Sequence, residues 1–285
     1  MTTLTTQVTR PPEPEAPRPV TVRRSRRRYG RWVLPLWGWA VIAWLSLPII
    51  VMIVFGFNDT TGKFNIKWQG FTLHWYRDLF DIPDLTDALE NSIEIAIITT
   101  IAATILGTFL GIALGRYRFR GSGSVTLLLF ANIAAPEVVL GAALLSMFLT
   151  LGIPRGFWTI TIAHIMFSLA YVAVTVRARM AGMDQSLEEA ARDLGAGPVS
   201  TFLRVTLPGI LPGVMSGALL AFALSIDDYI ITSFNAGNTV TFPLWVYGAS
   251  RVGVPPQVNV MGTIIFVFGV VAAMAGAITS RHRRT

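Results

Sequence analysis

Long apolar segments separated by short polar ones dominate the chain. Six of these segments contain about 20 or more residues, which is the length that an α-helix needs to cross the hydrocarbon core of a bilayer. They cover residues 32–57, 92–115, 124–150, 157–176, 210–233 and 258–280. The pattern therefore predicts an all-α membrane protein with six transmembrane helices.

The stretch before the first apolar segment has a different character. Residues 1–31 hold five prolines followed by a run of arginines and cannot form a core, so we expect a disordered tail. The segment 32–57 is too long for the apolar region of a secretion signal, and no small-residue cleavage site follows it. We therefore expect it to be retained as the first helix.

Composition and charge support a membrane protein. Only 14% of the residues are charged, against roughly 25% in soluble domains. The net charge of +7 does not indicate a nucleic-acid partner, because the basic residues flank the apolar segments. Placing both termini in the cytoplasm leaves eighteen Lys and Arg residues inside and five outside, so we expect that orientation. The chain has no cysteine and its three histidines are scattered, which argues against a metal site.

The first outside segment, 58–91, is unusually long. Apolar residues at helical spacing in its second half predict a short helix that lies along the outer face of the membrane. They are Leu79, Phe80, Leu85 and Leu89. Trp75 and Tyr76 precede this helix and are typical of interfacial anchors. The acidic residues nearby form either a solvated face or a docking surface for a binding protein.

The polar connection between the fourth and fifth apolar segments has a strong local pattern. Ser186 and Glu189 have the spacing of a capping box at the start of a helix. An apolar stripe follows at helical spacing. It consists of Leu187, Ala190, Ala191 and Leu194. Gly195 or Gly197 can end this helix in a left-handed cap, and Pro198 suits the first turn of a second short helix. A helix of two turns is not stable alone, so we expect it to pack on a partner.

These residues resemble the EAA loop of ABC-importer permeases. The resemblance covers Glu189-Ala190-Ala191, Gly195, Val205 and Leu207-Pro208, with Val205 standing where isoleucine is usual. It implies that the loop at 187–208 docks into a cleft of a cytoplasmic ATPase. The coupling residues that it implies are Glu188, Glu189, Ala190, Ala191, Gly195, Leu207 and Pro208. The alternatives are an ordinary amphipathic connector and a DNA-binding helix-turn-helix.

Other stretches extend the resemblance. Asn91-Ser92 is similar to the start of the type I permease core, which would cover 92–280 and leave 281–285 as a cytoplasmic C-terminus. The stretches most similar to the second permease of spermidine/putrescine importers, the PotC-like branch, are residues 135–145, 224–234 and 250–264.

Apart from Glu94 near the start of the second segment, three carboxylates fall inside the apolar segments, where an ionisable group is costly unless it is paired or hydrated. Glu137 follows Pro136 roughly 20 Å along the third segment, at 1.5 Å per residue, and the proline predicts a kink there. Asp227 and Asp228 lie roughly 25 Å along the fifth segment and point about 100° apart on a helix. One therefore lines a path while the other bonds a neighbouring helix. By resemblance, Glu137, Asp227 and Trp75 match residues implicated in polyamine uptake. A purely structural role for each stays open.

The resemblance implies a permease subunit that translocates polyamines by alternating access. The chain has no Walker A sequence, so it is not itself an enzyme and holds no cofactor; ATP and Mg²⁺ would bind to two copies of a partner ATPase. The other partners implied are a second permease, a PotB-like paralogue, and an extracytoplasmic binding protein, in a bacterial inner membrane. The alternatives are an importer of another solute, such as an amino acid derivative, thiamine or an iron chelate, and a stand-alone channel or secondary transporter.

Overall fold

The computed structural model describes residues 32–62 and 64–282. The predicted tail at 1–31 and the last three residues of the predicted C-terminus lie outside the described residues. The chain divides into two compact units at Leu47 and Pro48. In the first unit the described residues belong almost wholly to helix α1 (Val33–Phe55), whose last turns lie in the second unit.

Among the described residues, five helices are long and apolar enough to cross a membrane, or six if one bent pair is a single span. The five include α1, α3 (Pro83–Arg116), α6 (Phe157–Ala181) and α12 (Pro256–His282). The fifth runs over 198–226 and contains α9 (Leu207–Ile226). Counted with the bent pair, this agrees with the six predicted segments, of which the third and the fifth are altered.

The third segment is bent where a single helix was predicted. It consists of α4 (Ser122–Ala134) and α5 (Glu137–Thr150), and the chain bends by 109° between them. Pro136 caps α5 in an extended conformation, because proline lacks an N–H and disfavours a helical residue before it. The predicted kink is therefore a complete break, and Glu137 begins a new helix.

The fifth segment is also broken. It was predicted to continue to residue 233, but α9 ends at Ile226 and a separate helix, α10 (Ile230–Asn235), follows. The Asp228 carboxylate accepts the backbone N–H of Thr232 at 2.7 Å and so satisfies the start of α10. Aspartate competes in this way with helical hydrogen bonds, which explains the break.

The outer segment differs from the predicted interfacial helix. A four-residue helix, α2 (His74–Arg77), is followed by α3, which already begins at Pro83. Leu85 and Leu89 therefore belong to a long membrane helix and pack near Val260 of α12 instead of lying on a surface helix. A further short helix, α11 (Phe242–Ala249), was not predicted.

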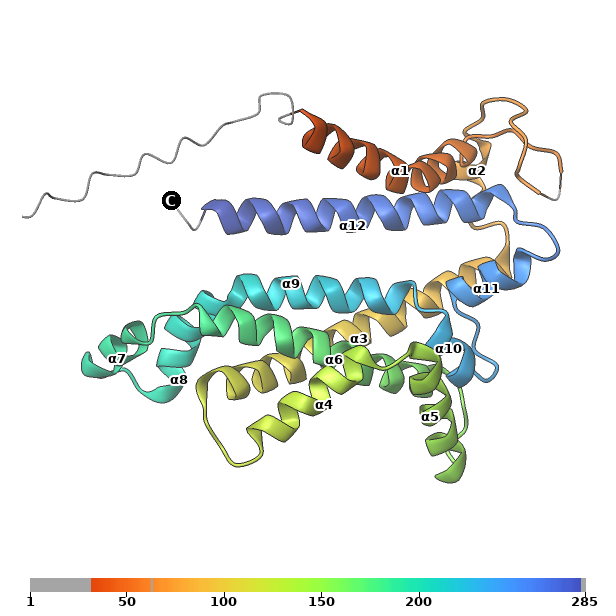
Figure 1. Ribbon diagram of the computed structural model, residues 1–285. Coiled ribbons are helices and arrows are strands. Elements are labelled where there is room, and N and C mark those ends of the chain that lie inside the picture. The colour runs from red at the N-terminus through yellow and green to blue at the C-terminus, as the bar shows by residue number, and fades with distance from the viewer. Residues whose placement is uncertain (1–31, 63, 283–285) are drawn as a thin grey trace, which may run out of the picture. The chain divides into compact units, whose positions relative to one another are not determined.

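Helices α3, α6 and α9 pack closely side by side in the second unit (Figure 1). Glycines of α3 make this approach possible: a Cβ at Gly107 would lie 2.7 Å from the Cβ of Val172, and one at Gly111 would lie 2.7 Å from the carbonyl oxygen of Ala173. Small residues at helix contacts are typical of membrane bundles. The loop helices α7 (Ser186–Asp193) and α8 (Pro198–Thr201) lie at one end of this bundle, and α10 and α11 lie at the other.

Candidate functional site: the coupling loop and the intramembrane carboxylates

Helix α7 ends in a glycine cap. Gly195 has φ +84°, in the left-handed region, and its N–H donates to the Arg192 carbonyl at 2.9 Å. The Ala196 N–H donates to the Ala191 carbonyl at 3.0 Å. This pair of hydrogen bonds is the Schellman motif. Gly197 has φ −68°, so Gly195 is the capping glycine of the two that the sequence allowed.

The start of α7 differs from the predicted capping box. Gln185 occupies the cap position, and Ser186 is the first helical residue. The Ser186 N–H donates to Asp184 Oδ1 at 3.0 Å, which lowers the pKa of that exposed carboxyl. Asp184 therefore supplies the oxygen that was expected from Ser186.

The second part of the loop is the beginning of the fifth long helix, where a separate short helix was expected. After α8 comes one π-helical turn, η2 (Phe202–Thr206), which runs directly into α9. The Leu207 N–H donates to the Phe202 carbonyl, five residues back. Pro208 follows and has no N–H to donate, and π-turns are frequent at functional sites. Leu207 packs against the core of α3, α6 and α9, whereas Pro208 is exposed.

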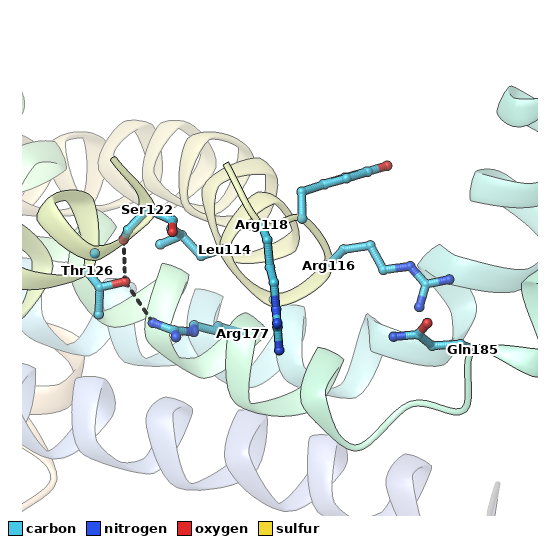
Figure 2. Close-up of a pocket in the computed structure, with 10 residues that line it drawn as sticks. Leu114, Arg116, Arg118, Ser122, Thr126, Arg177 and Gln185 are labelled. Atoms are coloured by element: carbon cyan, nitrogen blue, oxygen red, sulfur yellow. Dashed lines mark hydrogen bonds between the residues drawn. The ribbon is translucent and has the colours of Figure 1, made fainter. Parts of the chain in front are cut away.

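Glu188 is buried and anchors the loop. Its side chain is 5% exposed, and Arg116 at the end of α3 donates from Nη2 to Glu188 Oε2 at 2.6 Å. The Thr206 hydroxyl donates to Glu188 Oε1 at 2.9 Å. Arg116 and Gln185 face one another beside this contact (Figure 2). The sequence grouped Glu188 with the surface that docks on the ATPase, but the structure turns it inward, where it ties α7 to α3 and η2.

The rest of the loop presents an apolar surface. Leu194 is 89% exposed, and Leu187 and Val199 are also mostly exposed. Glu189 and Ala190 are exposed beside them, while Ala191 is half-buried. Large apolar side chains so exposed outside the membrane indicate a binding surface.

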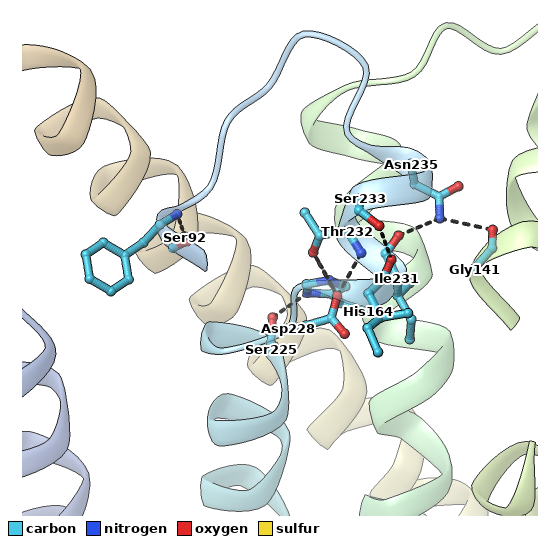
Figure 3. A network of polar contacts seen from close by, with 11 residues as sticks. Ser92, Gly141, His164, Ser225, Asp228, Ile231, Thr232, Ser233 and Asn235 are labelled. Carbon is cyan, nitrogen blue, oxygen red and sulfur yellow. Dashed lines mark hydrogen bonds and ion pairs between the residues drawn. The ribbon is translucent and has the colours of Figure 1, made fainter. Parts of the chain in front are cut away.

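The break between α9 and α10 contains a buried polar network (Figure 3). His164 of α6 lies with Nε2 3.2 Å from Asp228 Oδ1 and with Nδ1 2.8 Å from the Ser225 hydroxyl. Thr232 donates its backbone N–H and its hydroxyl to Asp228 Oδ1 at 2.7 and 2.8 Å. All four side chains are buried. The network therefore joins α6, α9 and α10, with Asp228 Oδ1 as the acceptor for Thr232 and the neighbour of His164.

Asp227 has the opposite environment. It caps the end of α9, its side chain is exposed, and it forms no ion pair within the described part of the chain. The two aspartates thus divide as the sequence suggested, with Asp228 bonded to a neighbouring helix and Asp227 open. Because α9 ends at Ile226, the helical angle of 100° between them does not apply.

Glu137 is the first residue of α5 and is half-buried. In residues 32–62 and 64–282 its carboxylate has no hydrogen bond or ion pair with another side chain. The unpaired amides at the N-terminus of α5 favour a negative charge there. The helix break therefore places the Glu137 carboxylate where the N-terminal amides of α5 stabilise its negative charge.

Trp75 lies in α2, where its indole N–H donates to the Asn58 carbonyl at 2.8 Å. It is half-buried and packs beside the cluster of α12 residues. Among the described residues, no hydrogen bond or ion pair joins Trp75, Glu137 and Asp227 to one another. The structure therefore does not gather the predicted path residues into one contact cluster.

Sequence reasoning missed the partners of these sites, among them His164, Arg116 and Thr206. His164 has one signal in the sequence, since a histidine inside an apolar segment is a functional candidate. Arg116 and Thr206 have none, because they meet Glu188 from 72 and 18 residues away, and only the packed structure brings them together.

Comparison with known proteins identifies the family. Residues 103–283 match the family called binding-protein-dependent transport system inner membrane component. The chain belongs to this family. It is therefore an inner-membrane permease component of a bacterial transport system, and it spans the membrane several times.

Two relatives from Escherichia coli (strain K12) are similar over most of the chain. The spermidine/putrescine transport system permease protein PotC is 39% identical over 245 residues, which are 86% of this chain and 92% of PotC. The putrescine transport system permease protein PotI is 38% identical over 249 residues, covering 84% of this chain and 88% of PotI.

Solved structures show the same fold. A chain of a bacterial ABC transporter involved in import of the acidic polysaccharide alginate superposes with a TM-score of 0.63 at 19% identity, covering 92% of this chain and 98% of that one. A chain of the MetNI methionine ABC transporter gives 0.57 at 15% identity, covering 70% and 95%. The fold is therefore that of the type I ABC-importer permeases.

Proposed function

We propose that this chain is the permease subunit of an ATP-driven importer and that its substrates are polyamines, namely spermidine or putrescine. The observation that carries the proposal is the 39% identity over 92% of the spermidine/putrescine permease PotC. The geometry adds an exposed carboxylate, Asp227, at a break between two helices.

The surroundings of Asp227 suit an alkyl ammonium ion. Tyr229 is two residues away, and its ring lies 4.6 Å from the ring of Tyr247, centroid to centroid. The Tyr247 ring already holds the Arg251 guanidinium, 4.9 Å from its centroid, so the rings attract a cation by their quadrupole, and Asp227 would attract an ammonium ion by charge. Irregular backbone at membrane depth occurs where it lines protein or a water-filled cavity. Asp227 would then contact an ammonium group of the substrate, while Asp228 holds the helix break in shape.

The exposed apolar face of α7 is the proposed docking surface for a partner ATPase. Leu187, Leu194 and Glu189 would enter its cleft, with one ATPase for each of two permease subunits. This arrangement puts both chain termini in the cytoplasm and requires a second, PotB-like permease to complete the pore. An extracytoplasmic binding protein would deliver the polyamine.

The geometry suggests how ATP binding to the partner ATPase would change the surroundings of the substrate. A single helical span over 198–226 begins in the docked loop and ends at the residue before Asp227. Movement of the loop by the ATPase would displace this helix as a lever. The outcome would be alternating access, with the surroundings of Asp227 changing between inward and outward states.

The test compares Asp227→Asn with Asp228→Asn in the complete transporter, reconstituted with its binding protein. We expect Asp227→Asn to raise the KM for spermidine about tenfold, which corresponds to losing a contact of about 1.4 kcal/mol, with thermal stability unchanged. Asp228→Asn is the matched control, and we expect it to lower thermal stability because it weakens a buried network. An unchanged KM in Asp227→Asn would show that Asp227 is not on the cation path.

A further inference from the structure

A basic pocket lies at the loop end of the bundle, apart from the docking face of α7. Its volume is about 520 Å³. It is formed where α3 ends, α4 begins and α6 passes beside them. Its lining includes Arg116, Tyr117, Arg118, Ser122, Thr126 and Arg177.

We infer that this pocket binds the phosphate of an anionic lipid headgroup. The inference rests on the proposed function in one respect, which is that this end of the bundle faces the cytoplasm. Basic pockets between transmembrane helices on that side of a membrane are typical sites for acidic headgroups.

The charges in the pocket are not balanced. Arg116 is paired with Glu188 at 2.6 Å. Arg177 donates only to a neutral group, the Thr126 hydroxyl, at 3.1 Å. Arg118 lies between Arg177 and Arg116 (Figure 2), and no acidic residue of the described chain pairs with it or with Arg177. Two guanidinium groups therefore share the pocket without a counter-ion. Guanidinium is the group best suited to bind phosphate oxygens in pairs.

Uncharged donors complete the lining. The Ser122 side chain borders the pocket at the first residue of α4, after Gly121 in a left-handed conformation. The first amides of an α-helix have no partner within the helix and favour a bound anion. The inference rests on Arg118 and Arg177, which the fold brings together. The backbone N–H groups at the start of α4 also favour an anion.

The position of the pocket favours a lipid over a soluble phosphate. Arg116 is the last residue of α3, so the pocket lies where a spanning helix leaves the membrane. Leu127 and Leu128 follow in α4 and are 70% and 69% exposed. They offer an apolar surface next to the charged pocket, as an acyl chain attached to a phosphate requires. Arg116 also holds Glu188, so a bound headgroup would lie next to the coupling loop and support its anchor.

The experiment uses the complete transporter in nanodiscs of phosphatidylethanolamine with and without phosphatidylglycerol. Lipid retention is measured by native mass spectrometry, and coupled uptake is measured in proteoliposomes of the same compositions. The pocket variant is Arg118→Gln with Arg177→Gln. Arg120→Gln is the matched control, because Arg120 lies in the same turn but does not line the pocket.

We expect phosphatidylglycerol retention to fall about fivefold for each pocket arginine removed, and to stay unchanged in Arg120→Gln. Coupled uptake should lose its dependence on phosphatidylglycerol in the pocket variant only. Equal retention in the pocket variant and the control would overturn the inference. So would inorganic phosphate that restores full uptake in neutral lipid through the same arginines, because the source would then be soluble. Retention requires no transport, so it tests the pocket even if the proposed substrate is wrong.

Discussion

Adjacent residues of α7 have opposite environments. Glu188 is buried against Arg116 and Thr206, while Glu189 is exposed beside Leu187 and Leu194. Successive helical residues differ by about 100°, so one glutamate faces the bundle and the next faces away from it. The same residue type therefore anchors the loop in one position and is free to contact a partner in the other.

Glu188→Gln should lower the thermal stability of the purified transporter. The change leaves Arg116 without its counter-charge, and breaking a buried pair costs up to about 3–5 kcal/mol. Because Arg116 is partly exposed, we expect a loss nearer the lower end. Adding Arg116→Gln should restore part of the loss, since the less exposed of the two guanidinium partners of Glu188 is then removed and only the exposed Arg192 remains.

Glu189→Gln is the control for this prediction. We expect it to leave stability unchanged and to weaken ATPase binding, measured by co-purification of the ATPase. Equal stability losses in Glu188→Gln and Glu189→Gln would contradict the anchoring role.

At the scale of elements, the breaks in the helices are the main functional features. The break at Pro136 sets Glu137 at a helix N-terminus, and the break after Ile226 frees Asp227 while it buries Asp228. The loop, by contrast, is joined to α9 without interruption over 198–226. The element that would carry force is thus continuous, and the elements that would contact substrate are discontinuous.

The turn between α7 and α8 tests this arrangement. A Cβ at Gly195 would meet nothing within 4 Å, so only its φ of +84° requires glycine. We expect Gly195→Asn to keep most uptake and ATPase activity, because asparagine tolerates the left-handed region. Gly195→Val should uncouple the two activities, since a β-branched residue there costs more than the roughly 1–2 kcal/mol of an ordinary one.

Gly197→Ala is the matched control, because Gly197 has φ −68° and open space around it. It should behave like the unchanged protein in both assays. Equal activity of the asparagine and valine variants at Gly195 would show that the left-handed cap does not set the loop.

At the scale of the whole molecule, the chain is one component of a transport system. It belongs to a family of transport-system components, and it carries an exposed apolar surface on α7. Apolar surface exposed outside the membrane is normally covered by a partner.

The purified chain alone in liposomes should therefore take up no spermidine, even under an imposed proton or sodium gradient. Adding the second permease, the ATPase, ATP and the binding protein should produce uptake. Gradient-driven uptake by the chain alone would instead identify a secondary transporter.

The sequence by itself determined the membrane class, the six apolar segments and the helix with its glycine turn in the loop at 187–208. These depend on local properties: the length of an apolar run, the spacing of Glu189, Gly195 and Pro208, and the conformational freedom of glycine. The tertiary structure decided what no local pattern contains. Glu188 pairs with Arg116, 72 residues away, and Asp228 with His164, 64 residues away. Which of two neighbouring carboxylates is buried depends on the side chain that another helix brings to it, and only the packed bundle sets that.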